Sequence, residues 1–419
     1  MPSKKTHGSP WGFVPTLYFA EGLPYIIVNT VSTIMYKKMG MSNQFIGLTS
    51  ILYLPWVIKM FWSPLVDVTF TKRAWIIATE LAMALLFVLL ALSLHTSLFV
   101  WFTLAAFITI AFISATHDIA VDGYYMLALD KKKQAFFLGV RSLFYRLAVI
   151  FGSGVLVVIA GTMEKRSGDI PLSWSLVMAG PAAVFLAAFL FHRAYLPFPG
   201  ADASGAGARA GTGFRSAFRT YFQQEKIRAI VGFILLYRLG EAMLVKMAAP
   251  FLLDSPASGG LGLATDTVGY VYGTVGVISL SAGGLLGGWL ISRYGLKRCF
   301  WPMALLLNAP DLAYVYMSVV TPSLKAVYLL VACEQFGYGL GFTAFGVFLM
   351  YIAREPYKTS HFAVSTGLMA LGMMLPGMIS GLLQEALGYT RFFIAVAVLT
   401  VPGMLLLLRI PLDNNTGKA

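Results

Sequence analysis

The chain has 419 residues, of which 58% are hydrophobic and only 12% are charged. Soluble domains carry about 25% charged residues, so this composition excludes an ordinary soluble protein and predicts a membrane protein. The formal net charge is +13, but the Lys and Arg residues stand at the ends of apolar segments and form no basic face, which argues against a nucleic-acid partner.

Apolar segments of about 20 residues, the length that crosses a bilayer, recur along the chain. They predict an all-α membrane protein with about twelve transmembrane helices in two six-helix bundles. The expected helices lie at 13–36, 45–64, 74–95, 98–129, 135–163 and 172–196, and then at 228–253, 266–292, 298–320, 324–353, 360–387 and 390–411. We therefore expect three parts: an N-terminal bundle at 1–196, a cytoplasmic linker at 197–226 and a C-terminal bundle at 227–419.

Lys and Arg residues are distributed unequally between the loops on the two sides. The poorer side holds only Lys37, Lys38, Lys165, Arg166, Lys325 and Arg391. The positive-inside rule then places both termini and the linker in the cytoplasm. The first helix follows Lys4 and Lys5 without a small-residue cleavage site, so we expect no cleavable signal peptide.

The linker has two kinds of sequence. Residues 201–211 have the Gly- and Ala-rich composition of a flexible connection. Residues 214–222 predict a basic amphipathic helix on the inner leaflet, with a plain soluble helix as the alternative. The two cysteines, Cys299 and Cys333, cannot make a disulfide framework and are expected to pack as small hydrophobic residues.

The first two predicted helices each carry an ionisable residue at membrane depth. Glu21 stands beside Gly22 and Pro24, which should weaken the helix and free backbone groups that need polar surroundings. Lys59 follows Pro55 in the second helix. A charged group at this depth is costly, so each is a candidate functional residue.

The fourth predicted helix carries Asp118 and Asp122, which are spaced i, i+4 and therefore share one face. With Glu21 they are the candidates for proton coupling, since a carboxylate beside a cation can exchange a salt bridge for a proton. The alternative is an ion-pair network with Lys59 or Arg146 that only holds helices together. His117 is either a proton relay or a buried core histidine.

Several further residues at membrane depth could bind an anionic substrate or pair with acids. They are Lys59, Arg146, Arg238, Glu241, Lys246, Tyr124, Tyr145 and Tyr237. Arg238 and Glu241 are i, i+3 neighbours that could neutralise each other. A tyrosine can both stack and hydrogen-bond, although any single tyrosine is more often part of the membrane core.

Two acidic positions in the second half have structural explanations. Asp311 follows Pro310, and a kink with a capping acid would explain it without a function. Glu334 and Gln335 precede a glycine-rich stretch at 336–341. We interpret these glycines as close helix packing, because the segment is an apolar span and no strand precedes it.

A basic loop joins the second and third predicted helices in each half. Its candidate residues for conformational change are Asp67, Lys72 and Arg73 in the first half and Arg293, Gly295, Lys297 and Arg298 in the second. The second loop resembles the major facilitator superfamily signature Gly-x-x-x-Asp-Arg-x-Gly-Arg-Arg, with Ser292 in place of the acid. The resemblance implies that transporter fold, with a substrate site near the membrane midplane.

Three segments carry a narrower resemblance: residues 56–67, 116–123 and 144–147. They resemble the AmpG and acetyl-CoA transporter family. The resemblance implies a multi-pass permease of the bacterial inner membrane that imports anhydromuropeptides by symport with protons in peptidoglycan recycling, with Asp118 essential and the proton gradient in place of a cofactor. Members of the family carry acetyl-CoA or siderophores, so the alternative is an importer of another anionic solute. The charged residues alone do not distinguish between these substrates.

Other function classes lack their sequence patterns. We find no nucleophile paired with a base, no His-Glu-x-x-His motif and no phosphate loop, so we predict that the chain is not an enzyme. No metal site is expected. The expected partners are a small anionic substrate and membrane lipids, and the protein is expected to act as a monomer.

Overall fold

The structure is a computed structural model, which describes residues 9–198, 216, 218–354 and 357–412. Throughout these residues the regular elements are helices, and none is a strand. Contacts divide the chain into two units, of which the first comprises residues 1–31 and 58–211 and the second residues 32–57 and 212–419. By its packing, the segment 32–57 therefore belongs with the C-terminal half of the chain.

Within the described residues, eight helical segments are long and apolar enough to cross a membrane. They are Asn43–Phe61, Lys72–Ser93, Phe99–Ala128, Phe136–Ser167, Ile170–Tyr195, Thr265–Tyr294, Leu296–Val320 and Ser360–Leu406. The prediction of an all-α membrane protein is confirmed. The number of about twelve spans and the cytoplasmic position of both termini stay predictions.

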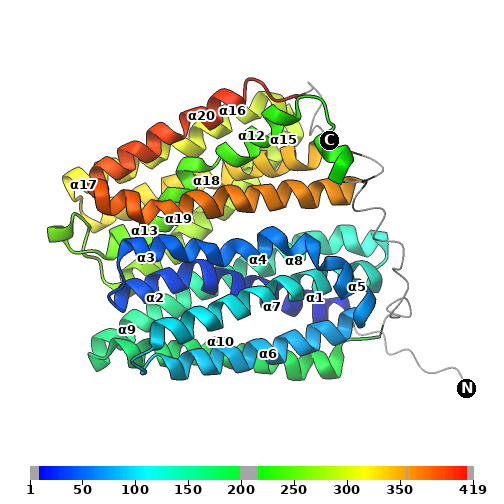
Figure 1. Cartoon of the computed structure of the whole chain (residues 1–419), viewed down its shortest axis with the longest axis horizontal. Helices are drawn as coiled ribbons and strands as arrows, with labels where there is room; N and C mark the ends of the chain where they lie inside the picture. The colour runs from blue at the N-terminus through cyan, green and yellow to red at the C-terminus, as the bar shows by residue number, and fades with distance from the viewer. Residues whose placement is uncertain (1–8, 199–215, 217, 355–356, 413–419) are drawn as a thin grey trace, which may run out of the picture. The chain divides into compact units, whose positions relative to one another are not determined.

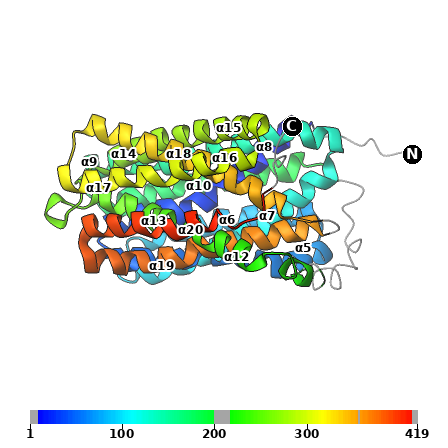
Figure 2. The same ribbon diagram turned by 90° about the horizontal axis from the view of Figure 1, so that it is seen from above.

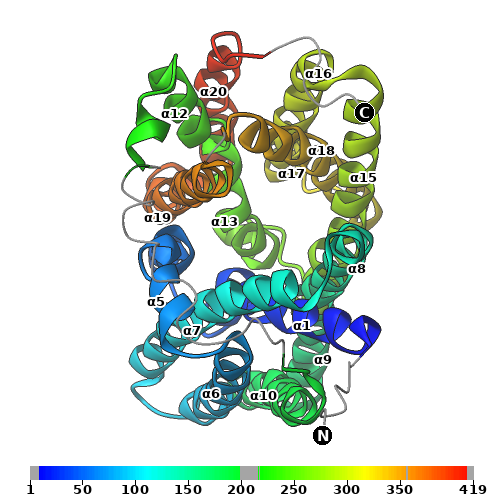
Figure 3. The ribbon, with the colours of Figure 1, turned by 90° about the vertical axis from the view of Figure 1, so that its right-hand side faces the viewer.

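The first unit is a bundle of long helices. Its elements are α1 (Pro10–Ile26), η1 (Ile27–Val31), η3 (Lys59–Phe61), α5 (Ser63–Thr69), α6 (Lys72–Ser93), α7 (Phe99–Ala128), α8 (Lys131–Val149), η4 (Ile150–Leu156), α9 (Val157–Ser167) and α10 (Ile170–Tyr195). The helix α6 packs between α7 and α10, and α1 packs on α8 (Figures 1 and 3). Buried apolar side chains of α1, α7 and α8 form one core cluster.

The first helix departs from regular α geometry where the sequence predicts weakness. The π-helical stretch η1 begins soon after Pro24, which has no backbone N–H to donate. Gly22 has a different role from the predicted one: a side chain there would press on the Tyr145 carbonyl oxygen of α8. Gly22 therefore lets α1 and α8 approach closely beside Glu21.

The second predicted helix is built from short turns of differing geometry. Its elements are α3 (Asn43–Leu48), the 3₁₀ turn η2 (Thr49–Tyr53), α4 (Leu54–Ile58) and the 3₁₀ turn η3 (Lys59–Phe61). A mid-span 3₁₀ turn commonly marks a hinge or a functional position. Lys59 opens the turn η3, so its side chain leaves the backbone at an irregular point of the helix.

The second unit combines the segment 32–57 with the C-terminal helices. Besides α3, η2 and most of α4, its elements are α2 (Ser32–Lys38), α12 (Ile227–Leu236), α13 (Leu239–Leu253), η5 (Pro256–Ser258), α14 (Thr265–Val268), η6 (Gly269–Gly276), α15 (Val277–Tyr294), α16 (Leu296–Asn308), η7 (Ala309–Asp311), α17 (Leu312–Val320), α18 (Leu324–Tyr351), α19 (Lys358–Leu399) and α20 (Val401–Leu406). The helix α18 packs between α15 and α16, and α19 packs on α12, α13 and α20 (Figures 2 and 3).

Glycines allow the close packing of this unit. A side chain at Gly337 or Gly341 of α18 would collide with Leu306 or Leu307 of α16. The interpretation of this glycine-rich stretch as close helix packing is therefore confirmed. The long helix α19 is interrupted at Gly388, where φ is 72°, a value that glycine adopts without strain.

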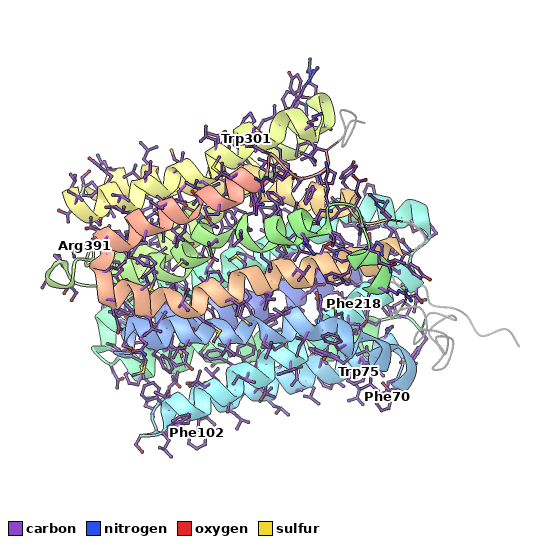
Figure 4. The ribbon with its side chains drawn as sticks, turned by 45° about the horizontal axis from the view of Figure 1, so that its top comes forward. Phe70, Trp75, Phe102, Phe218, Trp301 and Arg391 are labelled. Carbon is purple, nitrogen blue, oxygen red and sulfur yellow. The ribbon has the colours of Figure 1, made fainter. Side chains whose placement is uncertain are left out.

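Aromatic side chains mark the ends of the apolar helices, as in an interfacial belt. Phe70 and Trp75 meet edge to face at 5.6 Å beside the start of α6, whereas Phe102 lies near the start of α7 and points away from the ribbon (Figure 4).

In the linker, residues 218–222 are helical. Tyr221 is buried there with its hydroxyl 2.9 Å from Ser365 Oγ of α19, and this burial raises the pKa of Tyr221.

Candidate functional site

The acidic pair predicted from spacing lies on one face of α7 in the first unit, where both residues are partly buried. Lys59 of η3 donates to the Asp118 carboxylate and forms an ion pair with it. The Lys59 side chain is 35% exposed and that of Asp118 is 15% exposed. The cation is therefore the more accessible member of the pair.

Asp122 binds a different cation one turn further along α7. Arg141 of α8 lies 3.2 Å from Asp122 Oδ1, and the Tyr18 hydroxyl donates to the same oxygen at 2.9 Å. The Arg141 guanidinium also lies over the Tyr18 ring, 4.5 Å from its centre. Sequence reasoning missed Arg141 and named Arg146 as the partner of these acids; Arg146 is half-buried on the same helix.

Glu21 completes the group from α1. It is buried and interacts electrostatically with Asp118, Asp122 and Arg141. Three neighbouring carboxylates repel one another, so this group favours the binding of a proton. The three predicted acids thus lie together with Lys59 and Arg141, and we call these five residues the first acidic cluster.

A second polar group in the first unit was only partly visible in the sequence. Glu80 of α6 and His192 of α10 are fully buried, with Glu80 Oε1 2.6 Å from His192 Nδ1. His117 Nε2 lies 3.6 Å from the same oxygen, and His192 Nε2 lies 2.8 Å from Thr16 Oγ1. His117 therefore faces a buried acid, Glu80. The sequence offered no signal that paired Glu80 with His192.

The predicted tyrosines have mainly packing roles. Tyr124 is buried against Phe13, and its hydroxyl donates to the Pro197 carbonyl oxygen at 2.9 Å. Tyr237 lies in the core of the second unit with its hydroxyl 3.3 Å from the Gly341 carbonyl oxygen. Tyr145 is half-buried beside Gly22. Membrane core therefore describes Tyr124 and Tyr237 better than a binding cavity does.

The ionisable residues predicted on the seventh helix lie in and beside α13. Arg238 donates to the Tyr338 hydroxyl and lies over the Phe342 ring at 5.0 Å. Glu241 is fully buried and interacts with Arg238 electrostatically, yet neither of its oxygens has a hydrogen-bond partner within the described residues. The mutual neutralisation expected from their spacing is therefore incomplete. Lys246 is also buried and donates to Thr33 Oγ1 at 3.2 Å.

The predicted loop residues stand at helix ends. Arg73 donates to the carbonyl oxygens of Arg193 and Leu196 at the end of α10, and Lys72 lies against Gly123 of α7. Gly295 joins α15 to α16 with a φ of 82°. The other loop residues divide between the exposed Arg293, Lys297 and Arg298 and Asp67, whose side chain lies outside the described part of the structure.

A further polar network joins α2 and α3 to α13 and α19 within the second unit, and the sequence gave no hint of it. Lys37 forms an ion pair with Asp254 at 2.6 Å, and the Tyr389 hydroxyl donates to Asp254 at 2.6 Å. Asn43 donates to Gln384 Oε1 at 2.6 Å and to the Tyr389 oxygen at 2.9 Å. These contacts hold the segment 32–57 in the second unit.

Several relatives of this chain are named as transporters. A family model described as "Acetyl-coenzyme A transporter 1" matches residues 13–142. The "Anhydromuropeptide permease" of Escherichia coli (strain K12) is 26% identical over 398 residues, which cover 94% of this chain and 78% of the permease. The predicted resemblance to the AmpG and acetyl-CoA transporter family is confirmed. "Putative transporter AmpG 4" of Rickettsia conorii (24% identical, 94% of each chain) and an uncharacterized protein of Haemophilus influenzae (25% identical, 96% and 94%) are similar over nearly their whole lengths.

Solved structures show the same architecture. A D-xylose-proton symporter superposes with a TM-score of 0.73 at 13% identity and covers 97% of this chain and 98% of its own. The nucleoside transporter NupG gives a TM-score of 0.65 at 17% identity over 94% of this chain and 97% of its own. The chain has the fold of these solved transporters, as predicted. In sequence and in fold the chain is therefore similar to membrane transporters and not to enzymes.

Proposed function

We propose that this transporter imports anhydromuropeptides across the bacterial inner membrane, driven by symport with protons. We infer the substrate from the anhydromuropeptide permease of Escherichia coli, to which the chain is similar over 94% of its length. Anhydromuropeptides carry peptide carboxylates, and an anionic substrate suits the accessible Lys59. Arg146, Arg238, Lys246 and Tyr145 are proposed as further substrate contacts.

The observation that supports proton coupling is the charge balance of the first acidic cluster. Glu21, Asp118 and Asp122 are three acids, and Lys59 and Arg141 are two cations. With one proton on the acids the cluster is neutral, and without it the cluster carries one uncompensated negative charge. Because an unpaired charge inside a membrane is costly, the cluster favours a single exchangeable proton.

This proton can be linked to substrate through Lys59. When the shared proton lies on Glu21, Asp118 is ionised and retains Lys59; when it moves to Asp118, the ion pair is lost and Lys59 is released. The freed ammonium then binds a substrate carboxylate. Loss of the proton on the cytoplasmic side restores the Lys59–Asp118 pair and displaces the substrate. Rearrangement of the basic loops that contain Arg73 and Gly295 accompanies the change between the two open states.

The test is uptake of radiolabelled anhydromuropeptide into proteoliposomes under an imposed pH gradient, with and without a protonophore. We expect accumulation that collapses when the gradient is dissipated. A matched control is Glu385→Gln, which alters an exposed acid of α19 far along the chain from the first acidic cluster. Folded protein that shows no accumulation would contradict the proposed substrate.

Competition in the same vesicles separates the proposed substrate from the other anionic solutes. Unlabelled anhydromuropeptide should compete, whereas acetyl-CoA and a carboxylate siderophore should not. The arm with acetyl-CoA matters because the matching family model carries that name over residues 13–142. Competition by acetyl-CoA alone would transfer the proposal to acyl-CoA import and leave the coupling mechanism unchanged.

A further inference from the structure

Asp311 occupies an unusual position in the second unit. It lies in the 3₁₀ turn η7 between α16 and α17, directly after Pro310, so the predicted kink is present. Its side chain makes no capping hydrogen bond to α17, and both carboxyl oxygens are buried without a hydrogen-bond partner within the described residues. The capping explanation expected from the sequence is therefore wrong, and the acid needs another one.

Two more buried acids reach the same region. Glu334 of α18 is fully buried and accepts from the side chain of its neighbour Gln335 at 2.9 and 3.0 Å. Asp311 interacts electrostatically with both Glu334 and Glu241, and Glu334 interacts with Glu241. Close packing of α18 on α16 at Gly337 brings these helices together. We call Glu241, Asp311 and Glu334 the second acidic cluster.

A separate observation indicates that this cluster holds a ligand. The Tyr314 hydroxyl of α17 is fully buried, has no hydrogen-bond partner within the described residues and interacts electrostatically with all three acids. Asn308, the last residue of α16, also has an unpartnered side-chain oxygen. Buried polar groups in folded proteins are normally hydrogen-bonded. Several unpartnered oxygens in one region therefore need additional hydrogen-bond donors, which protons bound to the acids would provide.

The charges around the cluster favour protons as that ligand. Arg238 interacts electrostatically with Glu241, whereas Tyr272 and Tyr314 interact with the acids of the cluster. Tyr338 and Tyr53 interact in turn with Tyr272. On α19, Phe393 packs on Tyr314, and the titratable residues nearest to Phe393 in the sequence are Tyr389 and Arg391. Among the described acids, histidines and cysteines, no group of three or more has the geometry to hold a metal ion. Arg238 can balance one acid, which leaves two carboxyl charges to be neutralised.

We propose that Glu241, Asp311 and Glu334 form a second proton-binding site that holds two protons among three carboxyl groups. The site lies wholly within the second unit and shares no residue with the first acidic cluster. Protonated carboxyl groups become donors, so they can satisfy the Tyr314 and Asn308 oxygens. The proposal extends the proposed proton coupling to a second site, but proton binding there requires neither a substrate nor transport.

The test is infrared spectroscopy of the full-length protein in lipid, through the C=O stretching band that only protonated carboxyl groups show. At neutral pH we expect wild-type protein to show this band and Asp311→Asn to lose part of it. Tyr314→Phe should shift the band without reducing it, because it removes a neighbouring hydroxyl and no acid. The matched control Glu385→Gln alters an exposed acid, so the band should be unchanged.

Further variants and the addition of Na⁺ keep the test decisive. If Asp311→Asn fails to fold, Glu241→Gln replaces it with the same expected loss. Glu21→Gln assigns the contribution of the first acidic cluster, and the band that remains in that variant should still decrease when Asp311→Asn is added. A band abolished by Glu21→Gln alone would overturn the proposal. So would a band that disappears when Na⁺ is added at constant pH, since that result would indicate a cation site.

Discussion

The two acidic clusters are both built from buried or partly buried acids, but the acids differ in their ion-pair and hydrogen-bond partners. In the first unit, Asp118 has Lys59 and Asp122 has Arg141 as direct partners. In the second unit, Glu241 and Asp311 have no hydrogen-bond partner within the described residues, and Arg238 interacts electrostatically with Glu241. The first cluster can therefore exchange a proton for an ion pair, whereas the second can only gain or lose protons. In the first cluster, the accessible Lys59 is a cation that an anionic substrate could take over.

The largest effect is expected from Asp118→Asn. The amide keeps the shape of the side chain but cannot carry the exchangeable charge, so gradient-driven uptake should fall to background while expression and folding persist. Uptake is measured in proteoliposomes beside Glu385→Gln. Wild-type proton-driven uptake in Asp118→Asn would mean that Asp118 is a structural acid.

Lys59→Ala should impair both stability and transport. Removing one partner of a buried ion pair costs about 3–5 kcal/mol, and the partial exposure of Lys59 places the expected loss toward the lower end of that range. Thermal unfolding in detergent measures it. The double variant Lys59→Ala, Asp118→Asn should regain most of the stability, because no unpaired carboxylate remains; a purely additive double variant would argue against the pair.

Arg141→Gln should be more damaging than Arg146→Gln. Arg141 binds Asp122 directly at 3.2 Å, so its loss leaves that acid with only the Tyr18 hydroxyl. We expect a stability loss of roughly 1–3 kcal/mol together with reduced uptake. Arg146→Gln is the matched control on the same helix, and an equal or larger effect from it would contradict the assignment of Asp122 to Arg141.

Tyr124→Phe should have the smallest effect. It removes one hydrogen bond to the Pro197 carbonyl oxygen, which is worth about 1 kcal/mol, and leaves the ring packed on Phe13. Unfolding temperature and the KM for uptake are measured together. A changed KM at unchanged stability would indicate that Tyr124 contacts the substrate.

The sequence predicted the parts of the site that depend on spacing within one helix. Asp118 and Asp122 share a face because residues four apart lie one turn apart. Arg141 and Arg146 are five apart and point about 140° away from each other, so spacing alone does not say which one faces α7. The packing of α8 on its neighbours decides which arginine faces α7, and this packing cannot be read from the spacing of residues in the sequence.

Partners from distant segments were harder to foresee. Glu80 and His192 lie 112 positions apart, and each looks like an isolated polar residue until α6 and α10 are packed together. Lys37 and Asp254 likewise come from opposite halves of the chain. Asp311 was misinterpreted for a related reason. The proline beside it suggested a local explanation, whereas its neighbours in the structure are buried acids of α13 and α18.

Substrate-triggered proton movement tests the central proposal most directly. Proteoliposomes containing a pH-sensitive dye are exposed to anhydromuropeptide without an imposed gradient, with wild-type protein and Asp118→Asn compared. We expect the substrate to carry protons inward in the wild type and none in Asp118→Asn. Substrate uptake without proton movement in the wild type would contradict coupling at the first acidic cluster.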